Sequence, residues 1–94
     1  MLSQIPIDLG KIKKENIDKE ILRAALIAEL DAINLYEEMA AMATDKHIKE
    51  ILLDVAREEK THVREFQALL LRFDAEQVEE LAAGREEVEE LVGS

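Results

Sequence analysis

The chain has 94 residues, which allows one small domain, and its formal net charge is −10 at pH 7. This charge would repel nucleic acid and anionic lipid, so we expect neither nucleic acid nor a membrane as a partner. The sequence has no cysteine, which excludes disulfides and thiolate metal ligands, and its longest apolar run, residues 24–28, is far too short to span a bilayer.

The composition predicts a soluble, all-α protein. Hydrophobic residues make up 48% of the chain and charged residues 36%, with only three glycines and one proline, and no stretch alternates as a strand would. Residues 1–15 mix apolar, basic and turn residues around Pro6 and Gly10, so we predict an irregular N-terminal arm there. The helical domain is predicted to occupy residues 16–94.

A first long helix is predicted from Asn16, its N-cap, to about Ala43. Steps of four and three residues define its inward seam, which one carboxylate, Glu29, interrupts. The seam consists of Leu22, Leu26, Glu29, Ile33, Tyr36 and Ala40.

A second long helix is predicted from an N-cap at Thr44 to about Phe73, and the short turn makes the pair an antiparallel αα-hairpin. In its inward seam Glu59 and His62 stand together, three residues apart on one helix face. The seam consists of Ile48, Leu52, Val55, Glu59, His62, Phe66, Leu69 and Phe73.

A short third helix is predicted to start at Asp74, which forms a capping-box arrangement with Gln77, and to end at Gly84. Residues 85–91 have an apolar side, so they could form one or two further helical turns.

The hairpin would leave an apolar flank uncovered, so we expect at least a dimer, in which two hairpins form a four-helix bundle. The flank consists of Ile21, Ala25, Ala32, Leu53, Val63 and Leu70.

Glu29 and Glu59 lie fifteen residues before and after Thr44, which places both carboxylates at the same height in the hairpin. With His62 they provide half of the donor set of a di-metal site, which takes four carboxylates and two histidines in such bundles. A two-fold dimer would complete the set at the subunit interface. Oxygen and imidazole donors suit iron, manganese or zinc, and bridging carboxylates suit two irons. The alternative is a buried ion pair without metal.

Three other residues have weaker claims to the site. Tyr36 lies two turns after Glu29, and it either packs in the core or adjoins the metals. Asp31 is a candidate for guiding metal towards the site. His47, near the turn, is predicted to be a surface histidine.

Two runs of sequence resemble the encapsulated ferritins, which are ferritin-like proteins housed in encapsulin nanocompartments. Residues 21–39 contain Ala-Glu-Leu-Asp-Ala-Ile-Asn-Leu-Tyr-Glu, and residues 51–71 contain Ala-Arg-Glu-Glu-Lys-Thr-His. The likeness is strongest to the ferritin-like domain that some archaeal members carry fused to the shell protein. Two residues depart from the family pattern at the site where metal enters. Ala28 stands where members often have a glutamate, and Leu35 stands where they have a tryptophan. The chain ends without a recognisable targeting tail, so we expect a truncated cargo protein or a domain of a shell fusion.

The resemblance implies a half-ferritin whose dimer builds a di-iron ferroxidase centre from Glu29, Glu59 and His62, with Tyr36 nearby. It also implies a ring-shaped decamer made as a pentamer of dimers, an encapsulin shell protein as partner, and a place in the cytoplasm inside that shell, where oxidised iron is stored. Two alternatives remain: a non-catalytic helical assembly module with a structural metal, and a rubrerythrin-like protein that removes peroxide or oxygen.

Overall fold

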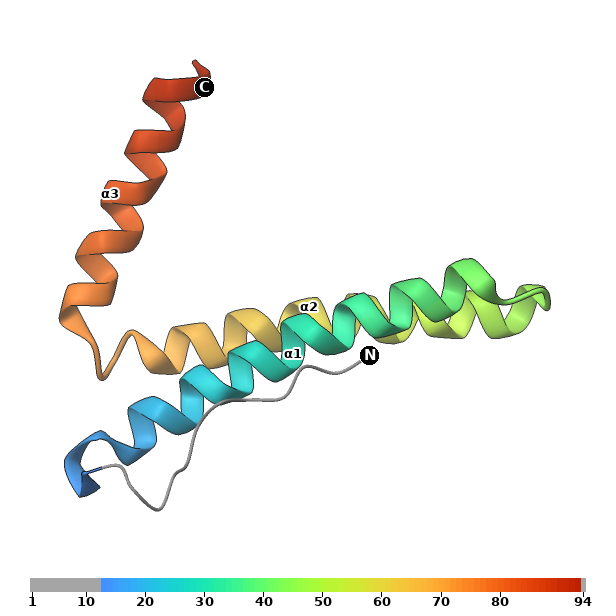
Figure 1. Ribbon diagram of the computed structural model, residues 1–94, viewed down its shortest axis with the longest axis horizontal. Coiled ribbons are helices and arrows are strands. Elements are labelled where there is room, and N and C mark those ends of the chain that lie inside the picture. The colour runs from blue at the N-terminus through green and yellow to red at the C-terminus, as the bar shows by residue number, and fades with distance from the viewer. Residues whose placement is uncertain (1–12, 94) are drawn as a thin grey trace.

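The computed structural model describes residues 13–93, and this part of the chain contains helices and no strand. A short 3₁₀ turn, η2 (Lys14–Asn16), leads into α1 (Ile17–Met42), which is followed by α2 (Lys46–Leu70) and α3 (Ala75–Val92) (Figure 1). The prediction of an all-α chain is confirmed. The arm predicted over residues 1–15 lies largely outside the described residues.

α1 and α2 run antiparallel, side by side, and form the predicted hairpin (Figure 1). Asn16 is the N-cap of α1 as predicted, although its side chain makes no capping hydrogen bond. The prediction of Thr44 as the N-cap of α2 is wrong. Asp45 holds that position with an extended backbone, and its Oδ1 accepts a hydrogen bond from the backbone N–H of Ile48 at 2.9 Å. Helix α2 also ends earlier than predicted, at Leu70.

α3 begins as predicted, because Asp74 caps it by accepting a hydrogen bond from the backbone N–H of Gln77 at 3.0 Å. The prediction that Gly84 ends this helix is wrong, since α3 continues to Val92. A helical glycine weakens a helix by about 1 kcal/mol relative to alanine but does not break it. The C-cap is Gly93, with φ 81°, a left-handed conformation that glycine adopts without steric strain.

The chain buries little of its apolar surface. Among the described residues the buried apolar side chains are Ile33, Ala40, Ala56 and Leu70. Leu70 was predicted on the uncovered flank, and it packs inside the hairpin instead. Three residues of the predicted α2 seam are exposed in one chain: Ile48, Leu69 and Phe73. A hairpin with so small a core leaves apolar surface for a partner to cover.

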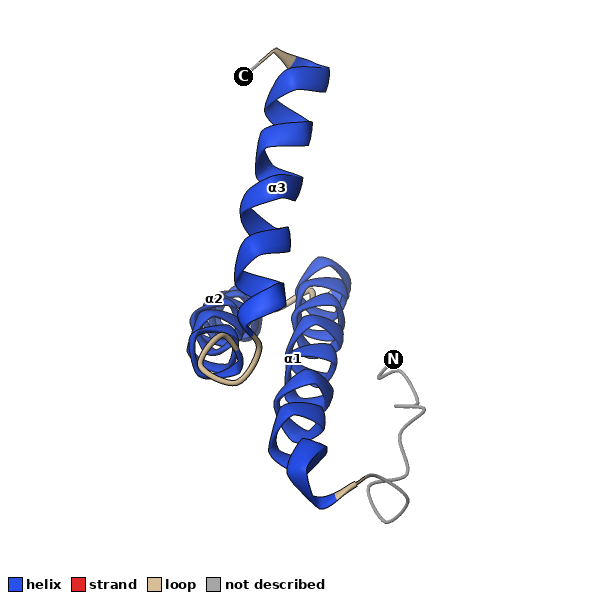
Figure 2. Cartoon of the chain, turned by 90° about the vertical axis from the view of Figure 1, so that its left-hand side faces the viewer, coloured by secondary structure: helices blue, strands red, loops and turns tan. Residues whose placement is uncertain are grey.

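α3 stands away from the hairpin (Figure 2). No Cα atom of α3 lies within 8 Å of a Cα atom of α1 or α2. The larger apolar side chains along α3 are exposed, namely Val78, Leu81, Val88, Leu91 and Val92. No helix within residues 13–93 is long and apolar enough to cross a membrane.

Candidate metal centre

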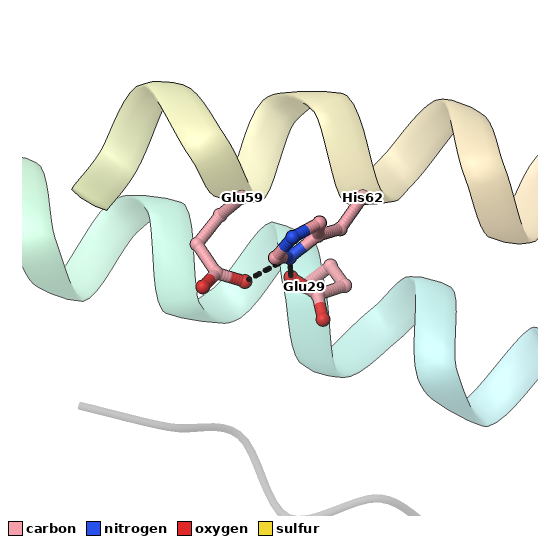
Figure 3. Close-up of side chains that lie close together, drawn as sticks. All are labelled: Glu29, Glu59 and His62. Carbon is pink, nitrogen blue, oxygen red and sulfur yellow. Dashed lines mark hydrogen bonds and ion pairs between the residues drawn. The ribbon is translucent and has the colours of Figure 1, made fainter. Parts of the chain in front are cut away.

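Glu29 on α1 faces Glu59 and His62 on α2, near the middle of the hairpin (Figure 3). The Nδ1 atom of His62 lies 3.5 Å from Oε2 of Glu29 and 3.4 Å from Oε2 of Glu59. One ligand atom from each residue lies within 4.8 Å of the others, and no other acidic or histidine cluster in the described part of the chain does this. The structure therefore brings together the three residues that the two seams predicted.

The helix geometry explains why these side chains converge. Glu59 and His62 are three residues apart on α2, so both leave the face that α2 turns towards α1. α1 runs antiparallel to α2, and its midpoint presents Glu29 at the same height. Buried Ile33 on α1 and Ala56 on α2 each lie about one turn from the cluster and hold the helices together beside it.

The cluster leaves one carboxylate oxygen without a hydrogen-bond donor. Oε2 of Glu29 is buried and has no hydrogen bond among the described residues. The nearest nitrogen, Nδ1 of His62, lies 3.5 Å from this oxygen and is hydrogen-bonded to Oε2 of Glu59, at 3.4 Å, instead. An unpaired buried acceptor is unfavourable by about 1–3 kcal/mol, and more when it is charged. A cation among these three side chains would remove that penalty.

The donor set fits a divalent transition metal. Two carboxylates and an imidazole are donors that suit Fe(II), Mn(II) and Zn(II). The side chains of Glu29 and Glu59 are each 19% exposed, whereas that of His62 is 41% exposed. The cluster is thus shielded by the hairpin on one side and open on the other, where a further ligand group has room to approach.

The other predicted residues lie outside this cluster. Tyr36 is half-buried on α1, and its hydroxyl makes no hydrogen bond to the described residues. Asp31 is half-buried, two residues after Glu29, and is not among the three clustered side chains. His47 is 86% exposed at the start of α2, where its Nδ1 lies 3.7 Å from Oε2 of Glu50. His47 is therefore a surface residue, as predicted.

One interaction beside the cluster was not predicted. Nζ of Lys60 on α2 lies 3.1 Å from Oε2 of Glu37 on α1, which joins the two helices one residue away from Glu59. Both side chains are nonetheless exposed. The opposite charges of the two residues are visible in the sequence. Whether they meet depends on the rotation of each helix about its axis, and the seam pattern does not define that rotation closely enough.

Comparison with known proteins identifies relatives of the whole chain. The family model described as Rubrerythrin matches residues 20–91. A curated relative, the ferritin-like-encapsulin shell fusion protein of Pyrococcus furiosus, is 68% identical over 96 residues, which cover 99% of this chain and 28% of the relative. This chain thus spans about a quarter of that protein. The crystal structure of an encapsulated ferritin domain from Pyrococcus furiosus has a TM-score of 0.84 and 57% identity, covering 100% of this chain and 98% of the other.

Proposed function

Because this chain belongs to the rubrerythrin family and to the encapsulated ferritins, we propose that it is a ferroxidase that oxidises Fe(II) to Fe(III) with oxygen at a di-iron centre shared by two chains. The observation that carries this proposal is the cluster of Glu29, Glu59 and His62, with its unpartnered carboxylate oxygen.

The centre requires two copies of the chain. Ferritin-like di-iron sites use four carboxylates and two histidines, and one hairpin supplies two carboxylates and one histidine. The open side of the cluster at His62 gives a second copy access to it, and the exposed apolar residues of the hairpin give that copy a surface to cover. Two hairpins would form a four-helix bundle, and five such dimers a ring-shaped decamer.

In this proposal each residue has a defined task. Glu29 and Glu59 would hold Fe(II) through carboxylate oxygens, and His62 would hold it through an imidazole nitrogen. Four carboxylates in one site favour Fe(III) over Fe(II) electrostatically, and this promotes electron transfer from iron to oxygen. Tyr36 lies on the same face of α1, two turns away, and is proposed to adjoin the site. Asp31 is proposed to attract incoming Fe(II).

The relative fused to an encapsulin shell protein suggests where the reaction takes place. We place this chain in the cytoplasm inside an encapsulin compartment, where the ferric product is stored. The shell protein, present as a fused or a separate partner, would enclose the iron that the centre oxidises.

The match to the rubrerythrin model favours a second candidate, the removal of peroxide or oxygen at the same centre. The described chain has one E-x-x-H pair in its core, at Glu59 and His62, and a site completed by a second copy suits either reaction. The third candidate, an assembly module with structural zinc, would bind metal at the same residues without oxidising iron.

Aerobic addition of Fe(II), followed by the absorbance of the ferric product, tests the proposal. Wild type should oxidise Fe(II) much faster than buffer, and Glu29→Ala should lose this activity because it removes a ligand from both halves of the site. Glu58→Ala is the matched control, since Glu58 is exposed and adjacent to Glu59 but outside the cluster. If Fe(II) is oxidised at the same rate with wild type, with Glu29→Ala and in buffer alone, the ferroxidase proposal is refuted.

Two further measurements separate the alternatives. Rates with peroxide in place of oxygen distinguish the rubrerythrin-like reaction, which predicts that peroxide is the preferred oxidant. Anomalous X-ray scattering across the iron edge from crystals soaked in Fe(II) would show whether iron lies between two chains, and zinc there in untreated protein would favour the structural role.

A further inference from the structure

The connection from α2 to α3 spans residues 71–74. After α2 the backbone continues in tight turns: the N–H of Arg72 donates to the carbonyl of Leu69 at 3.0 Å, and that of Phe73 to Leu70 at 2.9 Å. The backbone becomes extended at Asp74, with φ −141° and ψ 85°, and α3 begins at the next residue. Rotation about these two dihedral angles would swing the whole of α3 relative to the hairpin.

The side chain of Asp74 is held from both sides of this break. Its Oδ1 accepts a hydrogen bond from the backbone N–H of Gln77, in the first turn of α3, at 3.0 Å. Its Oδ2 accepts a hydrogen bond from Nη2 of Arg23, on α1, at 2.9 Å. The carboxylate of Asp74 therefore connects the first turn of α3 to Arg23 on α1, which lies 51 residues earlier in the sequence.

Within residues 13–93, α3 does not pack along α1 or α2. No Cα atom of α3 approaches those of α1 or α2 within 8 Å, and Phe73, next to the break, is 53% exposed. α3 extends away from the hairpin (Figures 1 and 2). A polar connection at its base is then the interaction available to fix that direction.

We propose that Arg23 and Asp74 form a latch that fixes the direction of α3 relative to the hairpin. An exposed ion pair contributes little, but the Asp74 side chain is only 11% exposed and uses both of its oxygens. Arg23 is itself held by Oε1 of Glu20, 3.3 Å from its Nη1, so less side-chain entropy is lost when the latch closes. The latch presents the exposed apolar residues of α3 in one orientation before any assembly forms, and it does not depend on the metal centre.

Distance measurements between two spin labels test the latch directly. The chain has no cysteine, so Glu65→Cys on α2 and Glu87→Cys on α3, both exposed, provide unique labelling sites. Labelled chains are diluted with unlabelled wild type, so that the distances measured lie within one chain of the assembly. We expect one narrow distance distribution for the otherwise wild-type chain and its loss, as a broad distribution, in Arg23→Met and Asp74→Asn. Asparagine remains a good N-cap, so the second variant removes the ion pair while retaining the start of α3.

Arg57→Met is the matched control, because Arg57 pairs with Asp54 within α2 and has no role at the break. Its distribution should stay as narrow as wild type, and circular dichroism should show unchanged helix content in all variants. A narrow distribution in either latch variant, or equal broadening in the control, would overturn the proposal. The first result would show that interactions other than the Arg23–Asp74 pair set the direction of α3. The second would show that the broadening is not specific to this pair.

Discussion

Two partly buried carboxylates in this chain have opposite surroundings. Glu29 has an oxygen with no hydrogen-bond donor, beside another carboxylate and a shared imidazole. Asp74 has a donor on each oxygen. The backbone N–H of Gln77 and then the guanidinium of Arg23 lower the pKa of Asp74 below its ordinary value of 3.8, against the opposing effect of burial. A carboxylate that is satisfied stabilises the fold, whereas one left unsatisfied is a candidate for ligand binding.

The lowered pKa of Asp74 gives a pH-dependent stability of known sign. Because ionised Asp74 is favoured in the folded state, its contribution is present above the unfolded pKa of 3.8 and disappears as the pH falls through the lower folded pKa. Metal-free wild type should therefore melt above Asp74→Asn at neutral pH, and the difference should shrink below pH 3.8. Thermal unfolding of both proteins across this range measures the difference. A gap that widens on acidification would contradict the assigned cause.

At the scale of the helices, the sequence pattern predicts the hairpin well and the helix ends less well. The seams and the equal spacing of Glu29 and Glu59 from the turn correctly predicted that these residues would face one another, because helical periodicity fixes which face a residue occupies. The α2 cap was misplaced by one residue. Thr44 and Asp45 are both good capping types, and the local backbone decides which side chain reaches the free N–H.

Substitution at the turn should distinguish the contributions of Thr44 and Asp45 to capping α2. Asp45→Ala should destabilise the chain by about 1 kcal/mol, because the N–H of Ile48 loses its acceptor, whereas Thr44→Ala should have little effect. Denaturant unfolding of the two variants beside wild type gives both values. Equal losses, or a larger one for Thr44→Ala, would contradict the observed cap.

The interior of α3 offers a stabilising substitution. Gly84 lies within the helix, and a Cβ atom added there would meet nothing within 4 Å in the chain. Gly84→Ala should therefore increase stability by about 0.5–1 kcal/mol, because alanine loses less backbone entropy on folding. Gly93→Ala should act in the opposite sense, since φ there is 81°. Helix content and thermal midpoint report both effects. A loss of stability in Gly84→Ala would indicate that another chain packs closely against this position.

For the whole molecule, one chain is incomplete in two ways. Its exposed apolar side chains lack partners among the described residues, and the cluster of Glu29, Glu59 and His62 is proposed to be half of a metal centre. The sequence pattern predicts a partner chain on both grounds, since two seams and one E-x-x-H pair cannot close a four-helix bundle. It did not predict the length or direction of α3. The length of α3 depends on the helix continuing through Gly84. Its direction depends on the contact between Arg23 and Asp74, and a contact between residues so far apart in the sequence leaves no periodic pattern.

Dimerisation and metal binding should strengthen each other if two copies share the centre. In metal-free protein, four facing carboxylates repel, so the dimer should be weak. Added Mn(II), at about 100 times its Kd, should stabilise the dimer by about 2.7 kcal/mol for each ion that only the dimer binds, or roughly 100-fold per ion in the dissociation constant of the dimer. Sedimentation equilibrium with and without Mn(II) measures this shift. Glu29→Gln should reverse both effects: its metal-free dimer should be tighter than wild type, because two charges are removed, and Mn(II) should no longer tighten it. A wild-type dimer that binds Mn(II) without becoming tighter would contradict a site shared by two chains.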